Sequence, residues 1–414
     1  MKKNRLEMIV KDTRNYLTIA IDIGKTTHYV YWCDCFGNEG TSTAFGNTRE
    51  GFKMLWQIIT TAQAKTGVSD VVVGFESTSC YWIPLAHFLL EKPVTMVQVN
   101  PMHTKRVKEL DGNSPLKSDK KDPRVIASLV RLGHWLTVVL PQGSTAELRQ
   151  LSHARERVVH DATVAVNRLR QAMDLLFPEF GGIMGFSSVT ARYLLRHYPN
   201  PQSVLEVDEH ELTAVIAKVS RKQLGRERAR QLLDAASATI GIKEGRAALL
   251  VEIHHLLDAL ERSESYTRAL EAEMNSCLRR IPCAEFLLSM KGIGTVIAAG
   301  ILGEVGDFTA YPTQASLQKM AGLSLYEVSS GIHQGTRRIT KRGRSKLRKY
   351  LFSACTNMIR KGGIFYESYQ ARIDRGKHKF NTYVALMRKL LNILYALVRD
   401  GVSYNPHHHC GRAA

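Results

Sequence analysis

The sequence predicts an α/β domain over residues 1–140, a long coiled-coil-like helical region over 145–280, a mostly helical domain over 281–400 and a flexible tail at 401–414. Three observations predict this α/β plus α class. Short apolar runs with the pattern of strands gather in the first part of the chain. Two long stretches in the middle keep apolar residues at helical spacing, and a glycine turn followed by an apolar helix marks the last part. A length of 414 residues suits two or three domains.

The composition is strongly basic. Lys and Arg number 57 against 38 Asp and Glu, which gives a formal charge of +19 and a pI near 9.7. This excess predicts a polyanionic partner, and nucleic acid is the first candidate. An anionic membrane surface is the alternative, but the sequence has no apolar run of about 18 residues and no signal-peptide pattern at Met1 to Val10. We therefore expect a cytoplasmic, nucleoid-associated protein that binds no membrane.

The cysteines predict neither a disulfide framework nor a zinc site. There are seven of them, an odd number spread over a long chain, and no CxxC pair occurs. The tail residues His407, His408, His409 and Cys410 could bind a metal, but a frayed polar tail is the simpler interpretation.

The first strand is expected around Ile19 to Ile23, where one carboxylate, Asp22, interrupts an apolar run that ends at Gly24. Burying an unpaired carboxylate costs several kcal/mol, so a metal ion or another cation is the expected partner. The alternative is an aspartate at the end of a strand that caps the next turn.

Further elements follow in the order βββαβαβα. After the first strand we expect two more strands, a helix capped by Asn47 or Thr48, an apolar strand that ends in Glu76, a helix, a fifth strand, and a loop that enters another helix. Their approximate bounds are 28–34, 41–45, a helix containing Phe52 to Ile59, 70–77, 81–90, 94–99 and 117–132.

This order, with acids at the ends of the first and fourth strands, predicts a ribonuclease-H-like fold. Asp22 and Glu76 can then converge on one cation if their strands are neighbours, because adjacent strands lie about 4.8 Å apart. Asp119 and Asp122 are three residues apart and share one side of a helical turn, and Asp122 could be the N-cap with Pro123 as the first helical residue. Four carboxylates make an oxygen-rich site that suits Mg²⁺ or Mn²⁺.

Two long helices are expected in the middle region. One runs from about Ala146 to Phe177, and the other from Glu244 to Leu278. They can pair within one chain or across a dimer, and the sequence leaves both possibilities open. A further helix is expected from Tyr383 to Val398, packed on the C-terminal domain.

Two segments of the C-terminal domain predict contacts with phosphates. The turn of Lys291, Gly292 and Gly294 before an apolar helix is typical of a helix-hairpin-helix module, although a simple tight connection would look the same. The second segment is densely basic, and a solvated helix face is its alternative interpretation. Its predicted contact residues are Arg337, Arg338, Lys341, Arg342, Arg344, Lys346 and Arg348.

These motifs resemble the insertion-sequence-110 family of transposases. Asp22 in AIDIGK, Glu76 in GFES, and Asp119 with Asp122 in KSDKKD resemble the DEDD tetrad of that family, whose first domain is similar to the junction resolvase RuvC. The AGL, Ser-Gly and Lys-Arg-Gly motifs at 321–343 resemble its second domain. On this resemblance the four acids are the metal ligands and Ser330 is the nucleophile. From the residues alone, Ser329-Ser330-Gly331 is only a flexible turn, and Ser329 is the rival.

The resemblance implies a DNA recombinase that acts on element ends and target DNA. It also implies an element-encoded guide RNA, Mg²⁺ or Mn²⁺ as cofactor, and a homo-oligomer, dimer or tetramer, with the helical middle used for dimerisation. Three other classes remain open: a metal-only nuclease without a covalent serine intermediate, an ATP-dependent kinase or actin-like ATPase suggested by DIGKTT, and an architectural DNA-binding protein.

Overall fold

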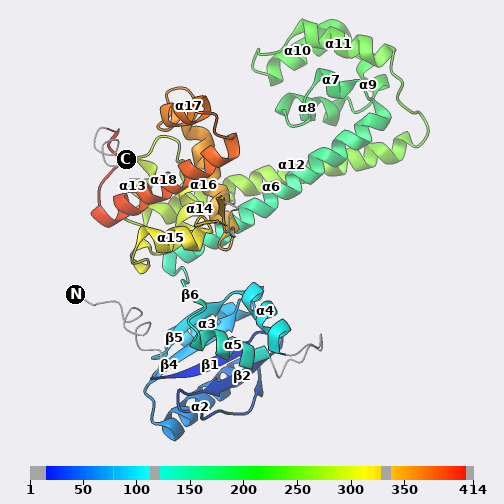
Figure 1. Ribbon diagram of the computed structural model, residues 1–414. Coiled ribbons are helices and arrows are strands. Elements are labelled where there is room, and N and C mark those ends of the chain that lie inside the picture. Colours follow the sequence, from blue (N-terminus) through cyan, green and yellow to red (C-terminus); the bar gives the residue numbers. More distant parts are fainter. Residues whose placement is uncertain (1–14, 78, 112–121, 328–336, 407–414) are drawn as a thin grey trace. The chain divides into compact units, whose positions relative to one another are not determined.

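A computed structural model describes residues 15–77, 79–111, 122–327 and 337–406. The chain forms two compact units, of which the first ends at Val139 and the second begins at Leu140. A β-sheet with helices packed on it makes up the first unit, and helices make up most of the second (Figure 1), as the sequence predicts. Within the described residues, no helix combines the length and apolarity needed to cross a membrane.

The first unit is built on one six-stranded sheet. Its strands lie in the order β3-β2-β1-β4-β5-β6. β1 pairs in parallel with β4, and β4 with β5, whereas the other pairs are antiparallel. The first five strands were predicted, but β6 was not, because three residues are too few to show an alternating pattern. The strands are β1 (Tyr16–Asp22), β2 (Thr27–Cys33), β3 (Thr43–Gly46), β4 (Asp70–Glu76), β5 (Thr95–Val99) and β6 (Trp135–Thr137).

Among the described residues of the first unit, four helices accompany this sheet. α2 begins after Thr48, whose side chain accepts the N–H of Gly51, so the predicted cap is confirmed. α5 packs on one sheet face, where Ile126 and Val130 join the core that includes Ala20 and Val72. α4 was not predicted, because its sequence is polar and lacks a clear apolar stripe. The helices are α2 (Arg49–Thr66), α3 (Trp82–Leu90), α4 (Pro101–Asp111) and α5 (Asp122–Arg131).

The second unit is built around two long helices, α6 (Gly143–Leu176) and α12 (Arg246–Arg279). They run side by side in opposite directions (Figure 1), and ion pairs join them at Arg155 with Glu271 and at Arg280 with Glu147. The predicted helix pair therefore forms within one chain. Its use in dimerisation stays a prediction.

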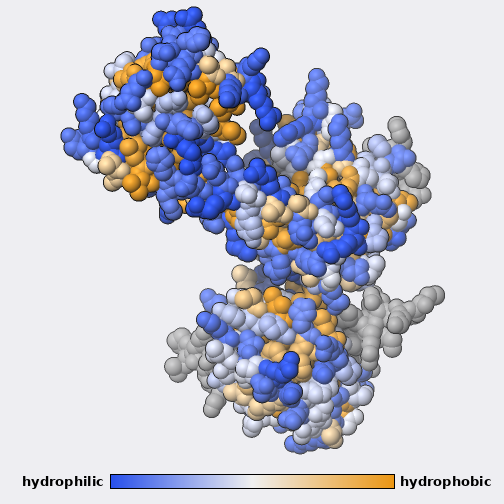
Figure 2. Space-filling model, turned by 180° about the vertical axis from the view of Figure 1, so that it is seen from behind, coloured by the Kyte–Doolittle hydropathy of each residue, from blue (hydrophilic) through white to orange (hydrophobic). Residues whose placement is uncertain are grey.

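A small helical lobe joins the far ends of this pair. Its core combines Phe177 and Phe180 with side chains from both long helices, among them Met173 and Ile253. Apolar side chains also reach its surface, and Figure 2 shows orange areas among blue ones on the face in view. The lobe contains α7 (Phe180–Ile183), α8 (Val189–His197), α9 (Pro201–Leu205), α10 (Glu209–Val219) and α11 (Arg226–Ser237).

The remaining helices surround the other end of the pair. α14 lies between α6 and α16, and two glycines allow the close approach. A Cβ at Gly303 would lie 2.7 Å from the backbone nitrogen of Arg149, and one at Gly300 would lie 2.4 Å from the ring of Tyr350. The elements are α13 (Ala284–Leu288), α14 (Thr295–Val305), η1 (Phe308–Ala310), α15 (Gln314–Ala321), β7 (Leu325–Tyr326), β8 (Arg338–Ile339), α16 (Ser345–Met358), α17 (Tyr366–Asp374) and α18 (Lys379–Asp400), of which α18 is the predicted last helix.

Candidate metal centre and nucleic-acid interface

Asp22 and Glu76 end two hydrogen-bonded parallel strands. The register pairs Ala20 with Gly74 and continues to the residues just before the two acids, so the acids occupy neighbouring positions. Side chains alternate between the faces of a strand, so Asp22 shares a face with Ala20, and Glu76 shares one with Gly74. That face is the one α5 covers, since a Cβ at Gly74 would lie 2.3 Å from a methyl group of Val130. The sheet therefore brings these two predicted ligands together.

Asp122 is the first described residue of α5, the helix on that same face, and it is only 7% exposed. The fourth predicted ligand, Asp119, lies outside the described residues. Within the described part of the chain, no three His, Cys, Asp or Glu side chains are grouped so that they could hold a metal ion. The oxygen donors suit Mg²⁺ or Mn²⁺ in kind, and the metal centre stays a prediction.

The turn that follows Asp22 is fixed by its own contacts. Gly24 donates its N–H to Nδ1 of His28 over 3.2 Å, and Asn47 donates to the carbonyl of Lys25. A Cβ at Gly24 would meet the carbonyl oxygen of Thr27 at 2.1 Å, so this position requires glycine. After β4, Gln98 donates to the hydroxyl of Ser77. The turn after Asp22 is thus held through its backbone, and Ser77, the residue after Glu76, is held through its side chain.

His28 is fully buried in β2 beside the ring of Phe45. Burial lowers its pKa, although a hydrogen bond with Asn47 acts in the opposite direction. The neutral imidazole can accept at Nδ1 and carry its proton on Nε2. Sequence analysis missed this histidine, although strand alternation places it inward with Val30.

Three of the seven residues predicted from the basic segment are partly buried and contact groups of the helices around them. Arg344 donates to the carbonyl of Glu304, and Arg348 donates to the carbonyl of Ala321 over 2.9 Å. Lys346 forms an ion pair with Glu156 over 3.0 Å, and Lys349, the next lysine along α16, forms a second one over 3.2 Å. These side chains hold α16 and the loop before it against α6, α14 and α15.

The other four residues of the predicted set, Arg337, Arg338, Lys341 and Arg342, are exposed. Arg337 pairs with Glu327 over 2.9 Å, a contact that water and salt weaken because the arginine is on the surface. These residues and their backbone follow directly on the segment that contains Ser329 and Ser330. Both serines lie outside the described residues, between the paired strands β7 and β8.

The turn before α14 has the features expected of a phosphate contact. Lys291 and Gly294 are exposed, and Gly294 precedes the helix without any side-chain cap on the first turn. Backbone N–H groups at such a helix start can bind an anion. Gly292 has φ +111°, and its carbonyl accepts from the side chain of Asn357 over 3.2 Å, which docks the turn on α16.

A buried ionic cluster joins α6 and α14 in the second unit. His153 lies 2.7 Å from the carboxylate of Glu304, a residue that is only 3% exposed. Burial alone would raise the pKa of Glu304, but the hydrogen bond from His153 and the guanidinium groups of Arg149 and Arg344 lower it overall. Sequence analysis missed this cluster, because its members lie far apart along the chain and carry no common motif.

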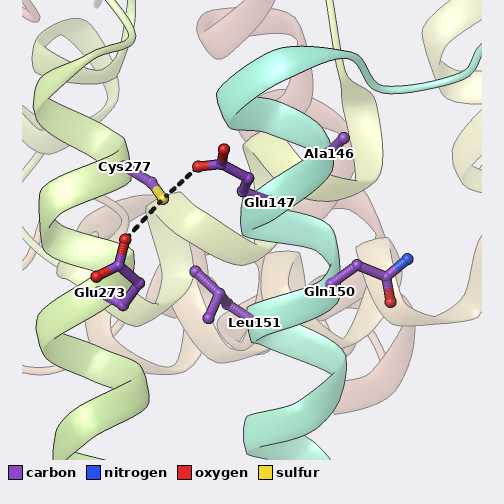
Figure 3. A pocket seen from close by; sticks show the side chains of 6 residues that line it. All are labelled: Ala146, Glu147, Gln150, Leu151, Glu273 and Cys277. Atoms are coloured by element: carbon purple, nitrogen blue, oxygen red, sulfur yellow. Dashed lines mark hydrogen bonds between the residues drawn. The ribbon is translucent and has the colours of Figure 1, made fainter.

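A pocket between α6 and α12 carries no reactive group. In Figure 3 the thiol of Cys277 points between Glu147 and Glu273, and it lies 3.2 Å from the carboxylate of Glu147. Burial and this carboxylate raise the pKa of Cys277. The thiol therefore stays protonated and is a poor nucleophile.

Two family models match the chain. The first, described as Transposase and covering DEDD transposases of IS110, matches residues 19–178 and so includes all four predicted acids. The second, described as Transposase IS116/IS110/IS902 family, matches residues 284–370 and includes Ser330 and the basic segment. Together the two matched segments cover more than half of the chain.

Curated relatives match over most of their length. An uncharacterized 43.6 kDa protein of insertion element IS110 from Streptomyces coelicolor is 25% identical over 93% of this chain and 95% of that protein. An uncharacterized 44.8 kDa protein of insertion element IS116 from Streptomyces clavuligerus is 25% identical over 94% and 96%. The pilin gene-inverting protein of Moraxella bovis is 22% identical over 94% and 98%.

Proposed function

Because the chain belongs to the IS110 family of transposases, we propose that it cuts and exchanges DNA strands with a metal-assisted serine nucleophile. The observation that carries this proposal is the placement of Asp22 and Glu76 at neighbouring ends of parallel strands, on the sheet face covered by the helix that begins with Asp122. A recombinase role agrees with the gene-inverting activity named for the Moraxella relative.

The first unit is proposed to have a ribonuclease-H-like fold. Support comes from its three-stranded antiparallel start, from β1, β4 and β5 in parallel, and from acids at the ends of β1 and β4. The proposed metal ligands are Asp22, Glu76, Asp119 and Asp122. Bound Mg²⁺ or Mn²⁺ would stabilise negative charge on the oxygens of a phosphodiester.

Ser330 is proposed as the nucleophile. Its hydroxyl oxygen forms a bond to the scissile phosphorus, its proton passes to a base, and the sugar oxygen of the cut strand leaves. A phosphodiester bond is thereby exchanged for a phosphoserine ester of similar energy, which a second DNA hydroxyl can attack to rejoin strands. The support is the resemblance of 321–343 to the second family domain, together with the exposed basic residues that follow.

The proposed contacts with phosphates come from the exposed members of the predicted set and from the partly exposed Gly292. These are Lys291, Gly292 and Gly294 at the start of α14, and Arg337, Arg338, Lys341 and Arg342 after β7. Arg344, Lys346 and Arg348 are proposed to act mainly by holding this surface in place, because protein groups already engage them. Guide RNA, element-end DNA, target DNA and a homo-oligomer remain the proposed partners.

The test uses purified full-length protein, Mg²⁺, the RNA encoded by the element and labelled element-end DNA. Denaturing protein gels compare wild type with Ser330→Ala, and Ser329→Ala is the matched control. We expect a labelled, protease-sensitive band in wild type and Ser329→Ala, and none in Ser330→Ala. Loss of the band in Ser329→Ala alone would assign the nucleophile to Ser329.

A metal-only nuclease is the second candidate, because the acids of the first unit could cut DNA without a serine. In that case Ser330→Ala would cut DNA as fast as wild type, and no protein would carry label. If the chain were an architectural DNA-binding protein, neither wild type nor the serine variants would cut DNA, whichever metal was added. Family membership argues against the ATPase alternative.

A further inference from the structure

Three aromatic rings from three helices meet on the surface of the second unit. The ring of Phe352 in α16 stacks on Tyr383 in α18, with centroids 4.7 Å apart and planes 27° from parallel. Tyr369 in α17 meets Tyr383 edge-on at 5.9 Å. Phe352 remains 40% exposed, and Phe380, one turn before Tyr383, is 52% exposed. We call Phe352, Tyr369 and Tyr383 the aromatic cluster.

Each ring of the aromatic cluster has a cation one helical turn away on its own helix. Lys349 precedes Phe352 by three residues, Arg372 follows Tyr369 by three, and Lys379 precedes Tyr383 by four. Residues at these spacings share a helix face. All three cations are exposed, although Lys349 also pairs with Glu156.

The surrounding chain carries almost no opposing charge. From Lys341 to Lys379 the sequence has only two acids, Glu367 and Asp374, among many lysines and arginines. Partly exposed rings interleaved with cations match unpaired nucleobases joined by phosphates, because bases stack on aromatic faces while cations neutralise the backbone. Paired bases in a duplex keep their faces stacked on each other and cannot use such rings.

We propose that the aromatic cluster binds unpaired bases of a single-stranded nucleic acid, with Lys349, Arg372 and Lys379 at its phosphates. This inference rests on the proposed function, since a recombinase handles nucleic acid, and it adds a site for unpaired strands whose residues are not among the four acids and Ser330. RNA and DNA offer the same stacking chemistry, so the experiment must distinguish them.

Packing is the competing explanation of the aromatic cluster. α17 has no fully buried residue, so the contact between Tyr369 and Tyr383 also helps to attach it to α18. If the rings serve packing alone, their loss should weaken single-strand and duplex binding to the same extent, or should leave both unchanged. If they stack on bases, only single-strand binding should fall.

The test measures binding of the full-length protein to three fluorescent probes of one sequence, a single-stranded DNA, a single-stranded RNA and a DNA duplex. Each single strand carries one 2-aminopurine, whose fluorescence falls when it stacks. Tyr383→Leu and Phe352→Leu should lower single-strand affinity about five- to 150-fold and abolish the fluorescence change. Duplex affinity should change less than about twofold, since backbone contacts persist.

Two variants serve as controls. Tyr266→Leu removes a tyrosine that is 53% exposed on α12, outside the aromatic cluster, and should bind every probe like wild type. Tyr383→Phe keeps a ring and should retain single-strand binding. If Tyr383→Leu misfolds, the exposed Phe352→Leu still decides the result.

Equal losses for the single strands and the duplex would overturn the proposal, as would unchanged single-strand binding. A fluorescence change with one single strand and not the other identifies RNA or DNA as the ligand. Covalent adduct formation on element-end DNA, measured in parallel, reports on the proposed function independently of this site.

Discussion

Charged side chains are used differently at the carboxyl ends of β1 and β4 and in the basic segment. At the sheet, strand pairing alone sets Asp22 beside Glu76. In the basic segment, Arg344 and Arg348 instead donate to main-chain carbonyls of the same unit, and Lys346 pairs with Glu156. A dense run of one charge therefore predicts a surface, but partners distant in sequence decide which members of the run face outward.

The largest effect should come from the acids. Asp22→Asn or Glu76→Gln should lower the rate of DNA cleavage on the order of 1,000-fold, because the proposed charge-stabilising metal would lose a ligand. Unfolding should not shift to lower temperature, since removing one of two neighbouring like charges relieves repulsion. Glu50→Gln, an exposed acid in α2, is the control for cleavage assays. Wild-type cleavage by Asp22→Asn would contradict the metal site.

Arg344 tests the opposite use of charge. Arg344→Met should destabilise the second unit by about 3 kcal/mol, because the variant leaves the buried Glu304 with fewer compensating groups. Far-UV circular dichroism during urea unfolding measures this. Lys341→Met, at an exposed position of the same segment, should change stability by less than about 0.5 kcal/mol. Equal stability of the two variants would show that Arg344 contributes no more to folding than the exposed Lys341.

Gly303 tests the close approach of α14 to α6. Gly303→Ala should cost about 1–3 kcal/mol, because its Cβ would overlap the backbone at Arg149. Gly182→Ala in α7 is the matched control, since nothing lies within 4 Å of its Cβ position. The same denaturation assay compares them, and a stable Gly303→Ala would mean that the two helices can separate without cost.

The two units should lose stability in different pH ranges. The pKa of His28 is lowered, so its contribution is complete above its ordinary pKa of 6.5 and is lost as pH falls from there toward the folded value. The pKa of Glu304 is also lowered, so its contribution is lost only as pH falls below its ordinary value of 4.5.

Tryptophan fluorescence separates the two pH effects, because all four tryptophans, Trp32, Trp56, Trp82 and Trp135, belong to the first unit. The thermal stability of the first unit, followed by fluorescence, should fall as pH drops below 6.5 in wild type. This pH dependence should be lost in His28→Leu. The stability of the helical second unit should depend less on pH below 4.5 in Glu304→Gln than in wild type. A shared pH profile for both signals would contradict this separation.

Local patterns were enough to predict the first five strands and the longest helices. Apolar runs gave β1 and β4, the helical period gave α6 and α12, and Thr48 gave the start of α2. The sequence also predicted the neighbouring acids, because carboxyl ends of parallel strands share an edge. It did not predict β6, the lobe helices or the role of Arg344, since these depend on contacts between segments far apart in the chain.

The sheet order has a consequence for the time course of folding. β1 and β2 are joined by a short turn, whereas β2, β3 and α2 lie between β1 and β4 in the sequence. Local pairings generally form before distant ones, so the hairpin should form first and the two acids should meet late. A growing or half-folded chain would then lack the proposed metal site and could not use it to cut the genome. Pulsed hydrogen exchange during refolding should show β2 amides protected before those of β4, and simultaneous protection would refute this order.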